Sequence, residues 1–208
     1  MHTFEDSLHK QSEHVIEAIQ QQLATLAQPI VVAIDGGSGA GKSSLATLIQ
    51  KQLDVALIPL DDFYSAHIPD QQWEAFTPEE KLEHIFNWKR LRQQVIEPLL
   101  QGDVARWHAF NFEAGPHLDG TYPMQDEFKQ QAPAAVILIE GAYSASPALT
   151  YLVDISILVD IPVNIRHARL AAREDHDFLT RWHALWDPVE DFYFNHVRPK
   201  DTFDIVLF

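Results

Sequence analysis

The segment GGSGAGKS at residues 36–43 constrains the fold more than any other feature of this sequence. It matches the pattern G-x-x-x-x-G-K-[ST] and lies between a run of β-branched residues, PIVVAID, and an apolar helical pattern, KSSLATLIQKQL. In that context glycines let backbone N–H groups turn toward an anion, and the helix N-terminus adds a positive dipole end. A glycine-rich turn without a ligand is the alternative. Because motif and context agree, the sequence predicts a nucleotide phosphate site.

Two side chains of this motif have specific expected roles. Lys42 would reach the β- and γ-phosphates of ATP or GTP, and the Ser43 hydroxyl would bind Mg²⁺. The residues predicted to bind the nucleotide are Gly36, Gly37, Ser38, Gly39, Ala40, Gly41, Lys42, Ser43 and Ser44.

Short apolar runs alternate with helical patterns along the rest of the chain. Near-continuous apolar strands are typical of a parallel sheet covered on both faces, so the pattern predicts an α/β fold. An amphipathic helix is expected over residues 3–27, which divides the chain into an N-terminal helix at 1–28 and the domain at 29–208 on which it packs.

Other segments have local signals. Thr77, Pro78 and Glu80 form a helix-start pattern with a capping box. The helical pattern at 88–101 is expected to break or kink at Pro98. Residues 64–76 and 112–132 show no clear periodicity and are expected to be loops that carry function.

Acidic residues end several of the predicted strands. Asp35, Asp61, Asp62 and Glu140 each follow an apolar run, and ligands of parallel sheets bind at the carboxyl ends of strands. These acids therefore suggest a metal site and a proton acceptor beside the phosphates, although strand-end acids also cap turns. Alternation places Asp61 and Asp62 on opposite faces, so only one enters the crevice and the other caps a turn or meets a basic partner. The spacing does not say which.

The charge balance narrows the class of partner. The chain of 208 residues has 15 basic and 30 acidic residues, a net charge of −15, which repels nucleic acids and anionic membranes. No apolar run approaches the ~20 residues that span a bilayer. The sequence has no cysteine, which fits a reducing cytoplasm. We expect a cytoplasmic protein that acts on a small molecule and binds neither nucleic acid nor membrane.

Basic residues gather at one place, whereas the eleven histidines are scattered. Arg166, Arg169 and Arg173 share one helical face, and arginine forks suit phosphate oxygens. A solvated basic face is the alternative, but in so acidic a chain the cluster favours a function. No H-E-x-x-H or comparable motif appears, so no histidine is assigned to a metal.

Four segments, in their order and spacing, resemble the uridine kinase-like branch of P-loop kinases: GGSGAGKSSLA, IPLDDFY, ILIEGAYSA and RLAARE. That branch also includes phosphoribulokinase and bacterial pantothenate kinase, and the chain looks most similar to its small bacterial uridine kinase-like proteins. The resemblance runs from about Ile30 to Phe208. It implies a P-loop kinase domain with a parallel sheet of about five strands, helices on both faces and a small lid that bears arginines.

The resemblance also implies roles for individual residues. Asp61 corresponds to the family's base toward the substrate hydroxyl, while Asp62 falls on a variable position. Mg²⁺ is implied at Ser43 and Glu140, with Asp61 nearby. Arg169 and Arg173 match the lid arginines that, with Lys42, act on the phosphates, and Arg166 is a weaker candidate.

The acceptor pocket departs from the pattern of nucleoside kinases. In FNFEAGPH, Gly115 stands where those enzymes carry a histidine. Edge-strand packing is the alternative role for this region. The residues predicted to bind the acceptor are Tyr64, Arg106, His108, Phe110 and Asn111.

The resulting functional prediction is an ATP-dependent small-molecule kinase that uses Mg²⁺ and phosphorylates a hydroxyl group, with a nucleoside such as uridine or cytidine favoured. Pantothenate, a sugar or a hydroxy acid is the alternative acceptor. A non-catalytic nucleotide-binding module is the alternative class, although the chain lacks the N-K-x-D signature of a GTPase and retains Lys42, Ser43, Asp61 and Glu140 together.

Overall fold

The structure, a computed structural model, describes residues 4–26 and 29–208. The expected ends of the first helix, at residues 3 and 27, and the expected boundary after residue 28 lie outside the described residues. A 22-residue helix, α1 (Phe4–Thr25), agrees with the prediction within that part.

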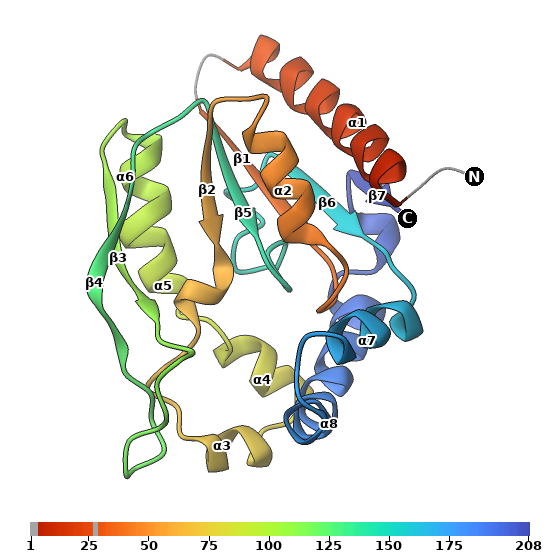
Figure 1. The fold of residues 1–208 in the computed structure, drawn as a ribbon. Coiled ribbons are helices and arrows are strands. Elements are labelled where there is room, and N and C mark those ends of the chain that lie inside the picture. Colours follow the sequence, from red (N-terminus) through yellow and green to blue (C-terminus); the bar gives the residue numbers. More distant parts are fainter. Residues whose placement is uncertain (1–3, 27–28) are drawn as a thin grey trace.

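A parallel five-stranded sheet forms the centre of the molecule, which confirms the predicted fold class (Figure 1). Its strand order is β2-β5-β1-β6-β7, so β1 lies in the middle and β5 separates it from β2. The strands are β1 (Ile30–Asp35), β2 (Val55–Pro59), β5 (Val136–Glu140), β6 (Ile155–Val159) and β7 (Ile205–Leu207).

Apolar side chains leave the sheet on both faces, as parallel strands require. On one face, Val32 and Leu138 pack with Leu45 and Ile49 of α2 (Lys42–Gln50), and α1 adds Ile19. On the other face the strands pack against the helices that follow β2 and against the C-terminal helix. These are α3 (Asp70–Ala75), α4 (Pro78–His84), α5 (Trp88–Leu91), α6 (Glu97–Leu100) and α8 (His176–Phe192).

A two-stranded antiparallel sheet lies beside this core. It pairs β3 (Ala105–Phe110) with β4 (Met124–Gln131), with a shift of register between His108 and Phe110. The expectation that residues 112–132 form a loop is therefore wrong for its last part. The strand was missed because β4 is half-exposed and polar, so it lacks an apolar signal. Helix α3 likewise occupies part of the expected loop at 64–76.

Local features explain where α4 begins and how the later helix continues past a proline. The capping box at Thr77 and Glu80 is confirmed, with both reciprocal hydrogen bonds present. Of the expected break or kink at Pro98, the break is wrong, since α5 runs through a π-helical segment (Arg92–Ile96) into α6. The wider π turn just before Pro98 accommodates a residue without an N–H group.

Candidate active site

The phosphate-binding loop connects β1 to α2 at the carboxyl edge of the sheet. Gly41 precedes the helix with a φ of 100°, and Gly39 has a φ of 81°, both in the region that favours glycine. Space matters as well: a Cβ atom on Gly39 would lie 2.7 Å from the backbone oxygen of Arg166. The loop therefore brings backbone N–H groups to a helix N-terminus, the arrangement that binds phosphate. In this structure three N–H groups of the loop donate to other groups of the protein, those of Gly36, Ser38 and Ala40.

Lys42 is buried and held by the loop itself. Its Nζ donates to the backbone oxygen of Gly36 at 2.8 Å and to that of Gly37 at 3.1 Å. These two backbone oxygens thus fix the ammonium group over the loop. A fixed positive charge at this point is available to a bound anion.

Ser43 and Glu140 come together from neighbouring elements. In the sheet register Glu140 pairs with Ile34 of β1 and Pro59 of β2, which places it beside the loop. The Ser43 hydroxyl lies 3.3 and 3.2 Å from its two carboxylate oxygens. Adjacent oxygens around Mg²⁺, each about 2.0–2.1 Å from the ion, are about 3 Å apart, so these two groups fit as ligands of one ion.

Asp61 and Asp62 have different surroundings, as predicted, but both lie in a 3₁₀ helix after β2, so strand alternation is not the cause. Asp62 is buried and its carboxylate accepts from Trp107 Nε1 at 2.8 Å and from Lys129 Nζ at 2.8 Å. It is the acid that meets a basic partner. Asp61 instead remains reachable by solvent at the start of the short 3₁₀ helix Leu60–Phe63, on the side of the loop lysine.

The carboxyl groups of Asp61 and Glu140 share an electrostatic environment. Surrounding protein desolvates Asp61 and raises its pKa, the charge of Asp62 raises it further, and Lys42 and Arg173 lower it. Burial likewise raises the pKa of Glu140, with Lys42 opposing and Asp61 reinforcing the shift. Two acids with raised pKa values near one lysine are typical of a functional site that binds a cation or takes up a proton.

Asp35 does not belong to this group. It is fully buried, and its carboxylate accepts from the backbone N–H groups of Gly36, Tyr143 and Ala145 and from the hydroxyl of Tyr193. Burial raises its pKa in spite of these bonds. The suggestion that Asp35 belongs to a metal site or proton acceptor beside the phosphates is therefore wrong, because this carboxylate holds together the loops that follow β1 and β5.

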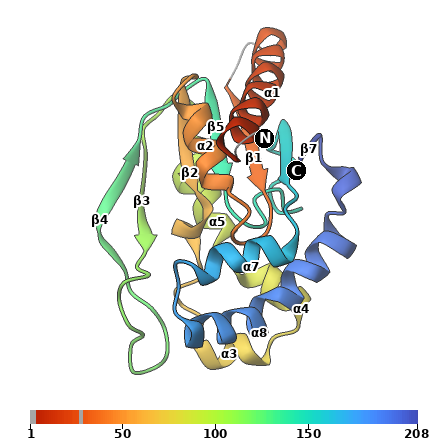
Figure 2. The same ribbon diagram turned by 45° about the vertical axis from the view of Figure 1, so that its right-hand side comes forward.

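The predicted lid arginines occupy three different positions. Helix α7 (Val163–Ala171) passes next to the phosphate loop (Figure 2). Arg169 Nη1 donates to the backbone oxygens of Gly39 and Ala40 at 3.2 and 3.1 Å. Arg166 reaches the oxygen of Ser38 at 3.0 Å, whereas Arg173 is 66% exposed and pairs with its neighbour Glu174. Only Arg173 reaches outward, although its charge still acts on Asp61.

Glu190 is a site residue that the sequence did not reveal. From α8 its Oε1 accepts from the N–H of Ser38 at 2.7 Å, and its Oε2 pairs with Arg166 at 2.8 Å. Both side chains of that pair are nearly buried, 8% and 11% exposed. A single acid in a helical pattern gives no signal for such a contact. Glu190 and Arg166 together hold the phosphate loop at Ser38.

We expect Glu190→Gln to lower the free energy of unfolding by about 3 kcal/mol, because it leaves the nearly buried Arg166 guanidinium without a counter-charge. Urea unfolding of the variant and the wild type measures this difference. Asp191→Asn, on the exposed neighbour, is the matched control and should change stability by less than about 0.5 kcal/mol. Equal stability of the two variants would contradict the assigned role.

The predicted acceptor residues do not form one cluster. Tyr64 and Phe110 meet, with ring centroids 5.0 Å apart, and Phe112 joins them. Arg106 is exposed on the opposite side of β3 from Trp107, and His108 stacks on Phe128. Asn111 accepts from Glu113 N and Ala114 N, a local turn. The structure therefore brings together only Tyr64 and Phe110 of the five.

An aromatic wall surrounds Tyr64 instead. Rings from several elements lie within 5.0–6.3 Å of its ring. Sequence reasoning did not place residues from two separate helices, one strand and two loops in one wall. Its members are Trp73, Phe86, Phe110, Phe112 and Trp186.

A cavity of about 400 Å³ opens on the other side of the loop. Small-ligand pockets have volumes of about 300–1,000 Å³, so it has room for a ring-sized group. Its lining combines the loop, the end of β6 and the segment before β7: Gly37, Leu158, Val159, Asp160, Ile161, Arg166, Phe194, Asn195, Pro199, Lys200 and Asp201.

Comparison with known proteins identifies the group to which this site belongs. Residues 31–200 match the sequence model of the phosphoribulokinase / uridine kinase family. The chain belongs to that family. Among curated relatives, a uridine kinase of Brevibacillus brevis is 28% identical over 183 residues, covering 84% of this chain and 78% of the relative. The chain is therefore a kinase of the P-loop type, as the resemblance implied.

Two solved structures share the fold. A protein described as a possible uridine kinase from Bacillus stearothermophilus aligns with a TM-score of 0.58 and 20% identity over 94% of this chain and 100% of that one. A protein from Silicibacter sp. TM1040, provisionally described as a fructose transport system kinase, has a TM-score of 0.62 and 21% identity, covering 92% and 97%. Within the described residues, no helix is long and apolar enough to span a membrane.

Proposed function

We propose that this kinase transfers the γ-phosphoryl group of ATP to a hydroxyl group of a neutral small molecule, with a nucleoside as the favoured acceptor. The single observation that carries the proposal is the placement of solvent-reachable Asp61 beside Lys42 and Glu140, at the mouth of the phosphate loop. A base, a phosphate-binding cation and a metal ligand are the groups that phosphoryl transfer requires.

The phosphates would lie along the loop from Gly36 to Ser43. Backbone N–H groups and Lys42 would hold their oxygens, and Arg173 would add a second positive charge on the outer side. Arg169, which contacts the loop carbonyl oxygens of Gly39 and Ala40, would position the loop. The cavity beside Gly37 offers room for the base of the nucleotide.

Ser43 and Glu140 would hold Mg²⁺, with Asp61 in the surroundings of the ion. When bound, the ion neutralises charge on the transferred phosphate oxygens. Asp61 would accept the proton of the acceptor hydroxyl while the oxygen of that hydroxyl forms its bond to the γ-phosphorus. The bond between that phosphorus and the bridging oxygen of ADP breaks in the same step.

Two observations favour a neutral, flat acceptor. In the wall around Tyr64, the ring of Phe112 is 60% exposed, whereas the other four rings are buried. A flat base would stack on such an exposed ring. The carboxylates of Asp61 and Asp70 act electrostatically on Tyr64 in this wall, and the chain carries a net charge of −15. Both features disfavour carboxylate acceptors such as pantothenate and hydroxy acids.

The test is consumption of ATP with Mg²⁺ across a panel of uridine, cytidine, neutral sugars, pantothenate and hydroxy acids. We expect turnover with a nucleoside and none with the carboxylates, and loss of turnover without Mg²⁺. Turnover with a sugar alone would show that the acceptor is a sugar and not a nucleoside. Turnover with pantothenate would refute the electrostatic argument. ATP binding without turnover on any acceptor would favour a regulatory module.

A further inference from the structure

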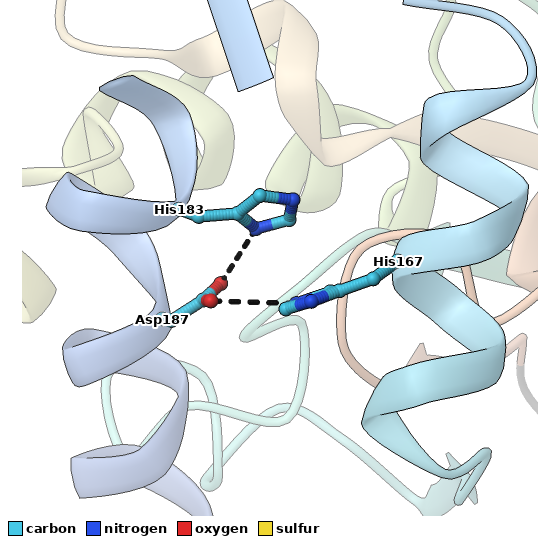
Figure 3. Close-up of side chains that lie close together, drawn as sticks. All are labelled: His167, His183 and Asp187. Atoms are coloured by element: carbon cyan, nitrogen blue, oxygen red, sulfur yellow. Dashed lines mark hydrogen bonds and ion pairs between the residues drawn. The ribbon is translucent and has the colours of Figure 1, made fainter. Parts of the chain in front are cut away.

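Two histidines and an aspartate from different helices meet at the α7–α8 contact (Figure 3). Asp187 Oδ1 lies 3.0 Å from His183 Nδ1, and Asp187 Oδ2 lies 3.3 Å from His167 Nε2. The two imidazole rings are themselves in contact, with centroids 3.9 Å apart. One potential ligand atom from each residue lies within 4.8 Å of the others.

The helices bring this group together. His183 and Asp187 are four residues apart, so both face the same side of α8. His167 comes from α7, sixteen positions before His183 in the sequence, and turns toward them across the contact. A search for a local metal-binding motif missed the cluster because one ligand lies on another helix.

The chemistry of the group matches a transition-metal site. Imidazole nitrogens together with one carboxylate are ligands for zinc and similar ions, whereas Mg²⁺ and Ca²⁺ prefer oxygen. Neighbouring ligands of tetrahedral zinc, at about 2.0–2.1 Å from the ion, are about 3.3 Å apart, close to the spacing seen here. Side-chain exposures of 24–38% leave a route for an ion and for water as a fourth ligand.

A second observation distinguishes the group from an ordinary surface ion pair. The Nε2 atom of His167 is buried and makes no hydrogen bond to any of the described residues, although Asp187 Oδ2 is 3.3 Å away. A buried polar atom without a hydrogen bond is uncommon and calls for a specific cause. A metal ion bound between His167 Nε2 and the Asp187 carboxylate would be such a cause, because it would take the place of the missing hydrogen-bond partner of that nitrogen.

We propose that His167, His183 and Asp187 bind one zinc-type metal ion that joins α7 to α8. Arg166, next to His167, and Glu190, one turn after Asp187, both hold Ser38 of the phosphate loop. The ion therefore locks together the two helices that fix the loop. This site is separate from Ser43 and Glu140, and it does not depend on the identity of the phosphoryl acceptor.

The test is calorimetric titration of the full chain with Zn²⁺ in a buffer that contains excess Mg²⁺, so that oxygen-ligand sites are already occupied. We expect about one Zn²⁺ per wild-type chain at this site, and His183→Gln to weaken that binding by about 100-fold or more, at least the loss seen when outer-shell partners of metal ligands are removed. Zn²⁺ at about 100 times its Kd should also raise Tm by about 5–10 °C in the wild type and not in the variant.

His196→Gln is the matched control, since His196 is an exposed histidine on the same helical segment. It should bind Zn²⁺ as the wild type does. Asp187→Asn provides a second variant that keeps the side-chain shape, and equal Tm values without metal show that each variant is folded. The absence of Zn²⁺ binding by the wild type, or equal binding by His183→Gln and His196→Gln, would overturn the proposal.

Discussion

Asp61→Asn is expected to reduce turnover by about 100-fold or more, the scale of a lost general base, while the protein still binds ATP. The carboxylate would take the proton of the acceptor hydroxyl, and an amide of the same shape does not. Steady-state kinetics with the acceptor found in the panel, together with ATP binding by calorimetry, measures both parts of this result.

The same variant should be at least as stable as the wild type at pH 7. The pKa of Asp61 is raised in the folded state, so folding favours its protonated form. Such a group contributes stability below the pKa of the unfolded chain, and this contribution is lost as pH rises through the folded pKa. At neutral pH the ionised carboxylate is thus unfavourable for folding, and asparagine removes that cost. Wild-type activity should fall on acidification at a pH above the ordinary range of an aspartate.

Asp62→Asn is the matched control, because it changes the neighbouring acid in the same way. It weakens the bond to Lys129 and retains an acceptor for Trp107, so we expect a loss of about 1–2 kcal/mol in stability and turnover within about tenfold of the wild type. The opposite pattern, an active Asp61→Asn and an inactive Asp62→Asn, would reverse the assignment of the base.

The sheet was predictable because its strands carry strong, simple signals. Each is a continuous apolar run, and the glycine-rich turn after β1 fixes where the helix begins. β4 and the helix through Pro98 were not predictable in the same way. β4 is stabilised by pairing with β3, and the helix continues because a π turn absorbs the proline. Both depend on neighbours that a local pattern does not contain.

The candidate site likewise contains residues that local patterns predict and residues that depend on distant parts of the chain. The places of Lys42, Ser43 and Glu140 follow from the loop motif and from the strand-end rule. Lys42 contacts the loop itself, and the contact of Ser43 with Glu140 requires only that β5 lies beside β1. Glu190 and the wall around Tyr64 come from elements far apart in the sequence. Burial also separates acids that look alike in sequence: Asp35 ends a strand just as Glu140 does, yet it is enclosed by backbone N–H donors.

Lys42→Ala is expected to lower turnover by about 100- to 1,000-fold and to weaken ATP binding, since it removes a positive charge that the loop holds in place for the phosphates. In the structure Nζ is held by the backbone oxygens of Gly36 and Gly37, so its positive charge is already located at the loop. A rigid cation in a partly desolvated site contributes far more than a mobile one in water.

Lys51→Ala is the matched control, because Lys51 is exposed at the other end of the same helix and should leave both ATP binding and turnover unchanged. Calorimetry with ATP and Mg²⁺, and with ADP and Mg²⁺, compares the two variants. A larger loss for ATP than for ADP is expected if Lys42 contacts the γ-phosphate, and an equal loss places it on the β-phosphate alone. ATP binding by Lys42→Ala with the wild-type Kd would remove the phosphate role, and with it the assignment of the loop as the nucleotide site.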